Sequence, residues 1–115
     1  MSSTVTAAEM GPIDLGHLAR MTCGEKALER EVLEMFLKQS DRLVSALSDT
    51  PEAAVDLSHA LKGSARAIGA FGVADLAANV EDAACWERDL TLPLADLKRA
   101  LAEARDAIEA LLRRP

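Results

Sequence analysis

The sequence predicts an all-α fold: an antiparallel up-down four-helix bundle with a short additional N-terminal helix. Three observations lead to this prediction. Apolar residues recur every three or four positions along several long segments. The prolines and glycines fall mostly between these segments, where helices start and stop. The chain of 115 residues is 50% hydrophobic but only 3% aromatic, so one small domain with an aliphatic core is expected.

The N-terminal end is expected to contain a loose segment and a short helix. Residues 1–12 are small, polar and aperiodic, which predicts a flexible N-terminal arm. A single helical domain is then expected over residues 13–115. Asp14 can cap a short helix that ends near Cys23 and Gly24.

Two long helices are expected in the middle of the chain. The string Thr-Cys-Gly-Glu at 22–25 fits a capping box, and the apolar period predicts a helix over about 25–48. Thr50, followed by a proline, is typical of a helix start and predicts a third helix that runs to about Ala70. Gly72 is expected to mark the next break.

Two further helices complete the predicted bundle. The fourth is expected to run to about Arg88. Leu92 and Pro93 then restart the chain, and the apolar positions over 94–111 alternate steps of three and four, as in a bundle helix. Because long amphipathic helices with short connections pack beside their sequence neighbours, an antiparallel arrangement is expected.

Charge and cysteine content argue against several classes of function. A net charge of −6 disfavours nucleic-acid binding, which needs a basic surface. Cys23 and Cys85 lack the spacing of a zinc site or a redox pair, so free thiols and no metal site are expected. No apolar run reaches the roughly 18 residues of a membrane span, and no signal peptide is recognisable. We therefore expect a cytoplasmic protein that contacts no membrane. A monomer is also expected.

The third predicted helix has two different faces. A helical wheel places Leu57, Leu61, Ser64 and Ile68 within one third of the circle, which predicts the buried stripe. The Ser64 hydroxyl is expected to bond back to the Ala60 carbonyl and to allow close helix approach. The opposite face, which is expected to face solvent, carries the polar residues of the helix.

That solvent face contains His59, Lys62, Gly63 and Arg66. A histidine is partly neutral near pH 7, so one ring nitrogen has a free lone pair that can accept and release a phosphoryl group. Lys62 and Arg66 would offset the negative charge, and Gly63 would leave room for a partner. From spacing alone, an exposed surface histidine with a glycine that serves helix packing is the alternative, and Arg66 is equally explained as a solvated side chain.

The extended string decides between these interpretations by resemblance. The residues His-Ala-Leu-Lys-Gly-Ser-Ala at 59–65, followed by Ile-Gly-Ala at 68–70, resemble the signature of the histidine-containing phosphotransfer (HPt) domain family of two-component phosphorelays. The resemblance extends over about 13–112 and includes the order of helices. It implies a phosphocarrier rather than an enzyme, without a cofactor of its own.

The resemblance also implies roles for individual residues. His59 would be phosphorylated through its Nε2 atom, Lys62 would stabilise the phosphate, and Gly63 would keep the site open. Gln39, on the preceding helix, resembles a family glutamine that hydrogen-bonds near the active histidine. Because Gln39 lies near an apolar stripe, its polar group needs a partner, although a side chain at the rim could reach water instead. Arg66 would help to hold the phosphate.

The expected partners are response-regulator receiver domains and a hybrid histidine kinase. A receiver would supply magnesium and most catalytic groups, and Ala60, Ala67 and Ala70 would form an apolar rim around the histidine for it. Two alternatives stay open: the phosphoacceptor domain of a histidine kinase, and a helical adaptor without phosphotransfer. His17 is expected to have a surface role, and Trp86 is expected to pack at the end of the fourth helix.

Overall fold

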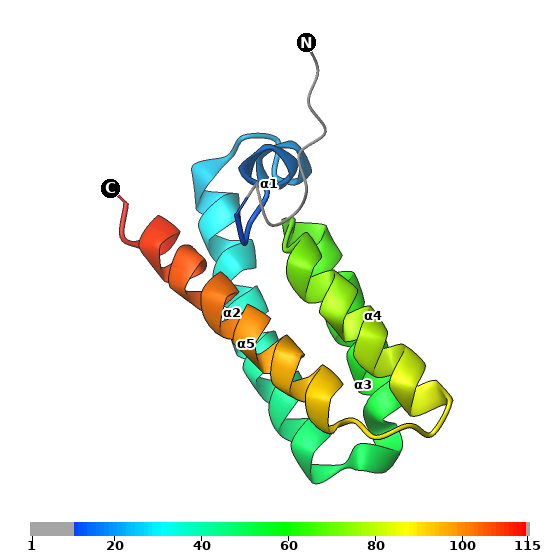
Figure 1. Ribbon diagram of the computed structural model, residues 1–115. Coiled ribbons are helices and arrows are strands. Elements are labelled where there is room, and N and C mark those ends of the chain that lie inside the picture. Colours follow the sequence, from blue (N-terminus) through cyan, green and yellow to red (C-terminus); the bar gives the residue numbers. More distant parts are fainter. Residues whose placement is uncertain (1–10, 115) are drawn as a thin grey trace.

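A computed structural model describes residues 11–114 of the chain, and within them the fold is all-helical with no strand (Figure 1). The prediction of an all-α fold is therefore confirmed. Of the predicted N-terminal arm, only Gly11 and Pro12 lie inside the described residues. The elements, in chain order, are α1 (Leu15–Met21), α2 (Lys26–Asp49), the short 3₁₀ turn η1 (Pro51–Ala53), α3 (Ala54–Ile68), α4 (Phe71–Cys85) and α5 (Thr91–Leu112).

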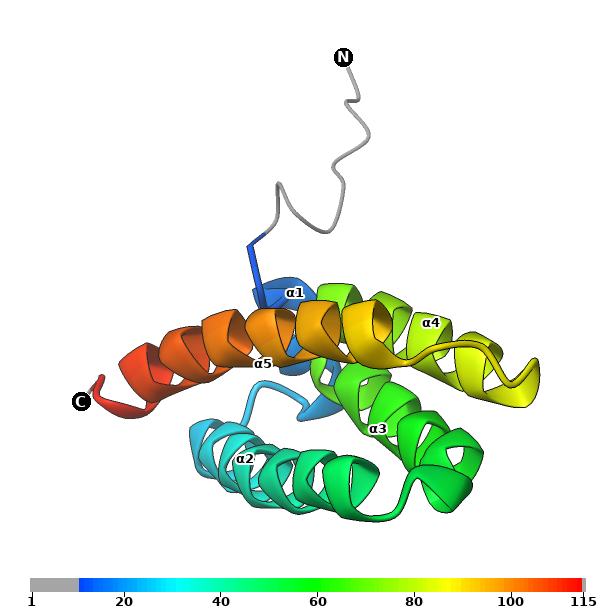
Figure 2. The same ribbon diagram turned by 60° about the horizontal axis from the view of Figure 1, so that its bottom comes forward.

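The four long helices pack side by side, and the short α1 lies across one end of them (Figures 1 and 2). Helix α3 packs between α2 and α4, and α5 packs against α4 and α2. An ion pair between Arg105 of α5 and Asp41 of α2 links these two helices. Because α3 has neighbours on two sides, its remaining face is directed to solvent.

The core is aliphatic, as the composition predicts. The largest fully buried apolar side chains are Leu18, Leu61, Val80, Leu97 and Ile108. Alanines with no exposed surface lie on three facing helices, and these small side chains allow the helices to approach closely: Ala65, Ala77 and Ala104. Phe36 of α2 is buried among the aliphatic residues.

The helix starts differ in part from the predicted caps. The Asp14 cap is confirmed, because its Oδ1 accepts a hydrogen bond from the His17 amide at 3.1 Å. The predicted capping box is wrong: Glu25 begins α2 without a side-chain cap, and the Thr22 hydroxyl donates to the Leu18 carbonyl at 2.8 Å. Thr22 thus closes α1 instead of opening α2. Thr50 precedes η1 but likewise makes no side-chain cap.

The break after α3 occurs at Gly69, three residues before the predicted position at Gly72. Gly69 has a φ of +85°, a left-handed conformation that glycine adopts without strain. Its carbonyl accepts a hydrogen bond from the Asp14 amide at 2.9 Å, and a Cβ at this position would lie 2.8 Å from the Asp14 carbonyl oxygen. Gly69 therefore both ends α3 and joins it to the start of α1, whereas Gly72 lies within the first turn of α4.

The turn between α4 and α5 also comes earlier than predicted. Helix α4 ends at Cys85 and not near Arg88. Trp86 follows with 67% of its surface exposed, so the prediction that it packs against the helix end is wrong. Leu90 precedes α5 without a side-chain cap, and one residue earlier the Oδ1 atom of Asp89 accepts hydrogen bonds from the Thr91 amide at 2.9 Å and from its hydroxyl at 2.7 Å.

The buried stripe of α3 is rotated from the predicted one. Its buried members are Ala54, Ser58, Leu61, Ala65 and Ile68, while Leu57 and Ser64 are half-buried. The Ser58 hydroxyl is satisfied by the Ala54 carbonyl one turn back, which explains how a polar side chain is accommodated in the core. The helical wheel predicted a buried stripe centred too close to the side that faces α2. The stripe is shifted because α3 also packs closely against α4.

Candidate functional site

His59 lies on the second turn of α3 and is directed to solvent, with 69% of its side chain exposed. The residues that follow it at helical spacing lie on the same face: Lys62, Gly63 and Arg66. An exposed imidazole can be reached by a second protein without any opening of the bundle. The position agrees with the face that the periodicity predicted.

A carboxylate from the neighbouring helix contacts the imidazole. Glu81 of α4 places its Oε2 atom 2.8 Å from Nδ1 of His59, and its Oε1 atom accepts a hydrogen bond from Nζ of Lys62 at 2.6 Å. Since an ionised carboxylate only accepts hydrogen bonds, Nδ1 must carry the proton in this contact. The neutral ring then has its lone pair on Nε2, the nitrogen on the far side from Glu81.

The electrostatics of this cluster favour an ionised Glu81. The hydrogen bond from Lys62 is the largest cause that lowers the pKa of Glu81 below its ordinary value of 4.5, and the contact with His59 lowers it further. Partial burial acts in the opposite direction and is outweighed. The carboxylate is therefore negatively charged at neutral pH, beside the imidazole.

The lowered pKa of Glu81 predicts a specific dependence of stability on pH. Because the folded-state pKa is below the unfolded value, the carboxylate stabilises the fold above about pH 4.5, and this contribution is lost as pH falls through the folded-state pKa. Urea unfolding should therefore show Glu81→Gln less stable than the native chain at neutral pH, with a smaller difference in acid. Glu34→Gln, at an exposed position on α2, is the matched control. A difference for Glu81→Gln that stays constant with pH would contradict this prediction.

Lys62 has a different environment from the one that its spacing predicted. Only 18% of its side chain is exposed, and its ammonium group is directed to Glu81 across the α3–α4 contact. An ammonium group has three donor hydrogens, so one hydrogen bond to Glu81 leaves two for another acceptor. In the structure, Lys62 therefore holds the carboxylate that in turn contacts His59.

Sequence reasoning missed Glu81, although a weak signal existed. The charged residues of α4 are all acidic, namely Asp75, Glu81 and Asp82, and α3 presents Lys62 and Arg66. This pattern favours an ion pair between the two helices. The choice of Glu81 among the acidic residues depends on the register of α3 against α4, which the sequence pattern does not determine.

Gly63 is exposed and has an ordinary helical backbone. A Cβ built at this position would have no atom within 4 Å outside the helix's own turns, among the residues described. The packing of the chain therefore does not require a glycine here, and the alternative that Gly63 serves helix packing is wrong. Glycine costs about 1 kcal/mol relative to alanine in a helix interior. Packing within the described residues gives no reason for this cost.

The remaining predicted residues of α3 divide into exposed and buried positions. Arg66 is exposed, and it makes no ion pair with any residue over 11–114. Ala60 and Ala67 are also exposed. Ala70 is fully buried, with its amide donating to the Ala65 carbonyl at 2.8 Å, so its predicted place in an exposed rim is wrong. The early end of α3 at Gly69 turns Ala70 into the core.

Gln39 lies on the exposed surface of α2 and is linked to α3 through Ser64. The Ser64 hydroxyl donates to Oε1 of Gln39 at 2.9 Å, and so it does not bond back to Ala60 as the sequence predicted. The structure thus gives Gln39 a polar partner on the helix that carries His59. The ring nitrogen of His59 itself contacts Glu81 and not Gln39.

The second histidine lies in a different environment. His17 of α1 is half-buried, its ring packs edge-on against Phe71 with centroids 5.1 Å apart, and its Nε2 atom is buried without a hydrogen-bond partner among the residues described. The predicted surface role of His17 is therefore wrong. Its contact with Phe71 joins α1 to the start of α4, and its Nε2 atom is not accessible to solvent.

The comparison with protein-family models identifies this architecture. The Hpt domain model matches residues 31–114, which include most of α2, all of α3, α4 and α5, and both His59 and Glu81. The chain belongs to the Hpt domain family. Members of this family act in histidine phosphotransfer with response-regulator receiver domains and are phosphocarriers rather than enzymes. No curated protein and no solved structure matched the chain.

Residues 11–114 contain neither a cluster suited to a metal ion nor a helix suited to a membrane. No group of three or more histidine, cysteine or carboxylate side chains over 11–114 is arranged to hold a metal ion. None of the helices in the same range is both long enough and apolar enough to cross a membrane. Cys23 and Cys85 are exposed free thiols.

Proposed function

We propose that His59 accepts a phosphoryl group from the phospho-aspartate of one receiver domain and passes it to the aspartate of another. The observation that supports this most strongly is the exposed imidazole with its Nδ1 atom against the Glu81 carboxylate. The contact leaves the lone pair of Nε2 free on the solvent side. That nitrogen is where a phosphoryl donor can approach.

The atoms and charges of the transfer balance without a proton acceptor. The Nε2 lone pair of His59 attacks phosphorus while the bond from phosphorus to the aspartate oxygen breaks, and the aspartate leaves as a carboxylate. The ring keeps its proton on Nδ1 and becomes a positively charged phosphoimidazole. Glu81, already ionised, is 2.8 Å from that proton and stabilises the new charge through a charge-assisted hydrogen bond. The reverse steps deliver the group to the second receiver.

Two cations supplement this arrangement. Lys62 fixes the position of Glu81 and retains donor hydrogens for a phosphoryl oxygen. Arg66 lies two turns beyond His59 on the same face, with no ion pair to any described carboxylate, so its guanidinium is available to the same group. Both residues would offset the negative charge that the phosphoryl group brings.

A receiver would dock over the exposed face of α3. Ala60, Gly63 and Ala67 form a strip of small exposed residues beside His59, which lets a partner's active site approach the helix backbone closely. Val55, one turn before His59 and 38% exposed, adds an apolar contact that the sequence analysis did not single out. The receiver would supply magnesium and the groups that activate its own aspartate, and a hybrid histidine kinase would start the relay.

We further propose an antiparallel order for the helices and a cytoplasmic, monomeric state for the protein. Each long helix would run antiparallel to the next, in an up-down four-helix bundle that forms one domain over 13–115. The short connections between α2 and α3, and between α3 and α4, support this arrangement. The protein would act as a cytoplasmic monomer and bind no nucleotide.

The two alternatives make different predictions. The phosphoacceptor domain of a histidine kinase would place its histidine in a two-helix hairpin that dimerises, whereas here α3 is packed between α2 and α4 within one chain. A helical adaptor would not require a histidine with a free ring nitrogen. The contact between Glu81 and His59 has no role in an adaptor, and the packing of α3 within a single chain disfavours a kinase hairpin, so phosphotransfer by an Hpt domain is favoured.

Transfer from a receiver tests the proposal directly. A receiver domain phosphorylated with a radioactive phosphoryl group is incubated with the chain, and the label on the chain is exposed to acid and to alkali. Phosphotransfer predicts label that is labile in acid and stable in alkali. Absence of label with every receiver tested would overturn the proposal and would favour an adaptor.

A further inference from the structure

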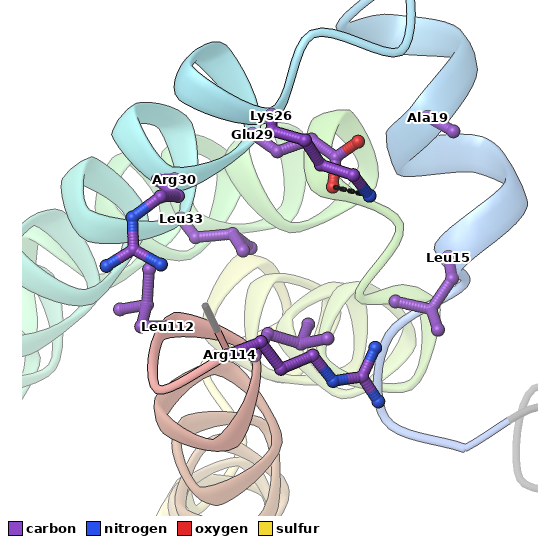
Figure 3. A pocket seen from close by; sticks show the side chains of 9 residues that line it. Leu15, Ala19, Lys26, Glu29, Arg30, Leu33, Leu112 and Arg114 are labelled. Carbon is purple, nitrogen blue, oxygen red and sulfur yellow. Dashed lines mark ion pairs between the residues drawn. The ribbon is translucent and has the colours of Figure 1, made fainter.

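A groove lies at the end of the molecule where α1, the start of α2 and the end of α5 meet (Figure 3). Its volume is about 410 Å³. Leu33 and Leu112 form part of its apolar lining, and Leu15, half of whose surface is exposed, lies at one side. The groove can hold one or two aliphatic side chains but is too small for a whole helix.

The charges around this groove are opposite in sign to those of the chain as a whole. Lys26, Arg30 and Arg114 line it with a single carboxylate, Glu29, although the chain has a net charge of −6. Glu29 is 3.9 Å from Lys26, which offsets its charge. The lining residues themselves therefore carry a net positive charge, around an apolar interior.

The two arginines are available to a ligand. Neither Arg30 nor Arg114 has a carboxylate of residues 11–114 within ion-pairing distance. Figure 3 shows their guanidinium groups on separate sides of the opening, one beside Leu112 and one directed toward Leu15. A guanidinium group binds a carboxylate through two parallel hydrogen bonds, so this spacing suits a segment that carries an acidic group on each side of an apolar one.

From this complementarity we propose that the groove is a second docking surface, which binds an acidic segment of a protein partner. The segment inserts a leucine-like side chain between Leu15, Leu33 and Leu112, and its flanking carboxylates pair with Arg30 and Arg114. This inference does not depend on phosphotransfer at His59.

The groove and the phosphoryl site are far enough apart to be used together. The groove lies at the start of α2, where Lys26 is the first residue. Helix α3 begins after the opposite end of α2, and a helix of 24 residues is about 36 Å long. His59 is the sixth residue of α3. A partner bound at the groove would therefore hold the protein in an assembly and leave the His59 face open to receivers.

The test uses a short fluorescent peptide with a Leu-Leu pair between two runs of glutamate. Fluorescence anisotropy should show saturable binding to the native chain. The double substitution of Arg30→Ala and Arg114→Ala should weaken binding by about tenfold or more, because two charge-assisted contacts are lost. Arg42→Ala, which removes an exposed arginine of α2 outside the groove, should leave binding unchanged. A peptide with alanines in place of the leucines should bind more weakly.

Three results would overturn the proposal. The first is that the peptide does not bind, or that it binds equally well to the doubly substituted protein, which circular dichroism shows to be folded. The second is self-association by light scattering that the double substitution abolishes, which would assign the groove to a second copy of the chain. The third is octanoate competing as tightly as the peptide, which would indicate a small-molecule site. Labelling of His59 by a receiver, measured on the same variants, reports separately on the phosphotransfer proposal.

Discussion

His59→Gln is expected to abolish labelling of the chain by a phosphorylated receiver. A glutamine amide can still donate a hydrogen bond to Glu81, so the contact between α3 and α4 is retained, but its nitrogen has no lone pair that attacks phosphorus. His17 cannot replace it, because that ring is half-buried against Phe71. The label transferred from the receiver should fall to background over the full time course.

The other histidine of the chain is the matched control for this experiment. His17→Gln removes an imidazole from α1 and leaves the exposed face of α3 unchanged, so labelling should continue. Circular dichroism and thermal unfolding establish that each variant is folded at the assay temperature. Label that persists in His59→Gln would show that another group is phosphorylated and would contradict the role assigned to His59.

Substitution of Gly63 is expected to move stability and function in opposite directions. Gly63→Ala should raise the free energy of unfolding by about 1 kcal/mol, because alanine is the better helix former and a Cβ here would meet no atom within 4 Å outside the helix's own turns among residues 11–114. Gly63→Leu should keep the fold but abolish transfer, because a branched side chain beside His59 blocks the approach of a receiver's active site. Urea unfolding and the transfer assay measure the two effects.

The glycine that ends the same helix, Gly69, provides the contrast. Gly69→Ala should lower the free energy of unfolding, since its φ is +85° and a Cβ would lie 2.8 Å from the Asp14 carbonyl oxygen. Its transfer activity per folded molecule should be retained, because Gly69 is buried away from the exposed face of α3. If Gly63→Leu transfers as fast as the native chain, then Gly63 does not provide access for a partner.

The periodic part of the fold could be predicted from the sequence. The spacing of apolar residues indicated the long helices and the exposed side of α3, because buried positions recur with the period of the helix. Local signals were less reliable: Asp14 caps α1 as expected, whereas Thr22 bonds within α1 and leaves α2 uncapped by a side chain. A threonine hydroxyl near a helix end has several backbone carbonyls and amides within reach, so the residue type alone does not determine its hydrogen-bond partner.

The candidate site could be predicted only as far as it lies on one helix. His59, Gly63 and Arg66 share the exposed face of α3 because helical geometry places them there. The partner of His59 is Glu81 of α4, 22 residues further along the chain. Which residue of α4 reaches His59 depends on the axial register of the two helices. Ala70 is buried for a similar reason, because the position of the break at Gly69, and not the helical period, determines where it points.

We infer that Glu81 keeps the proton of His59 on Nδ1 and so makes Nε2 the phosphoryl acceptor. Nitrogen-15 NMR of the imidazole, with phosphorus-31 NMR after transfer from a receiver, tests this claim most directly. We expect a protonated Nδ1 in the free protein and a phosphoryl group bonded to Nε2 afterwards. A phosphoryl group on Nδ1, on another residue or nowhere on the chain would contradict it.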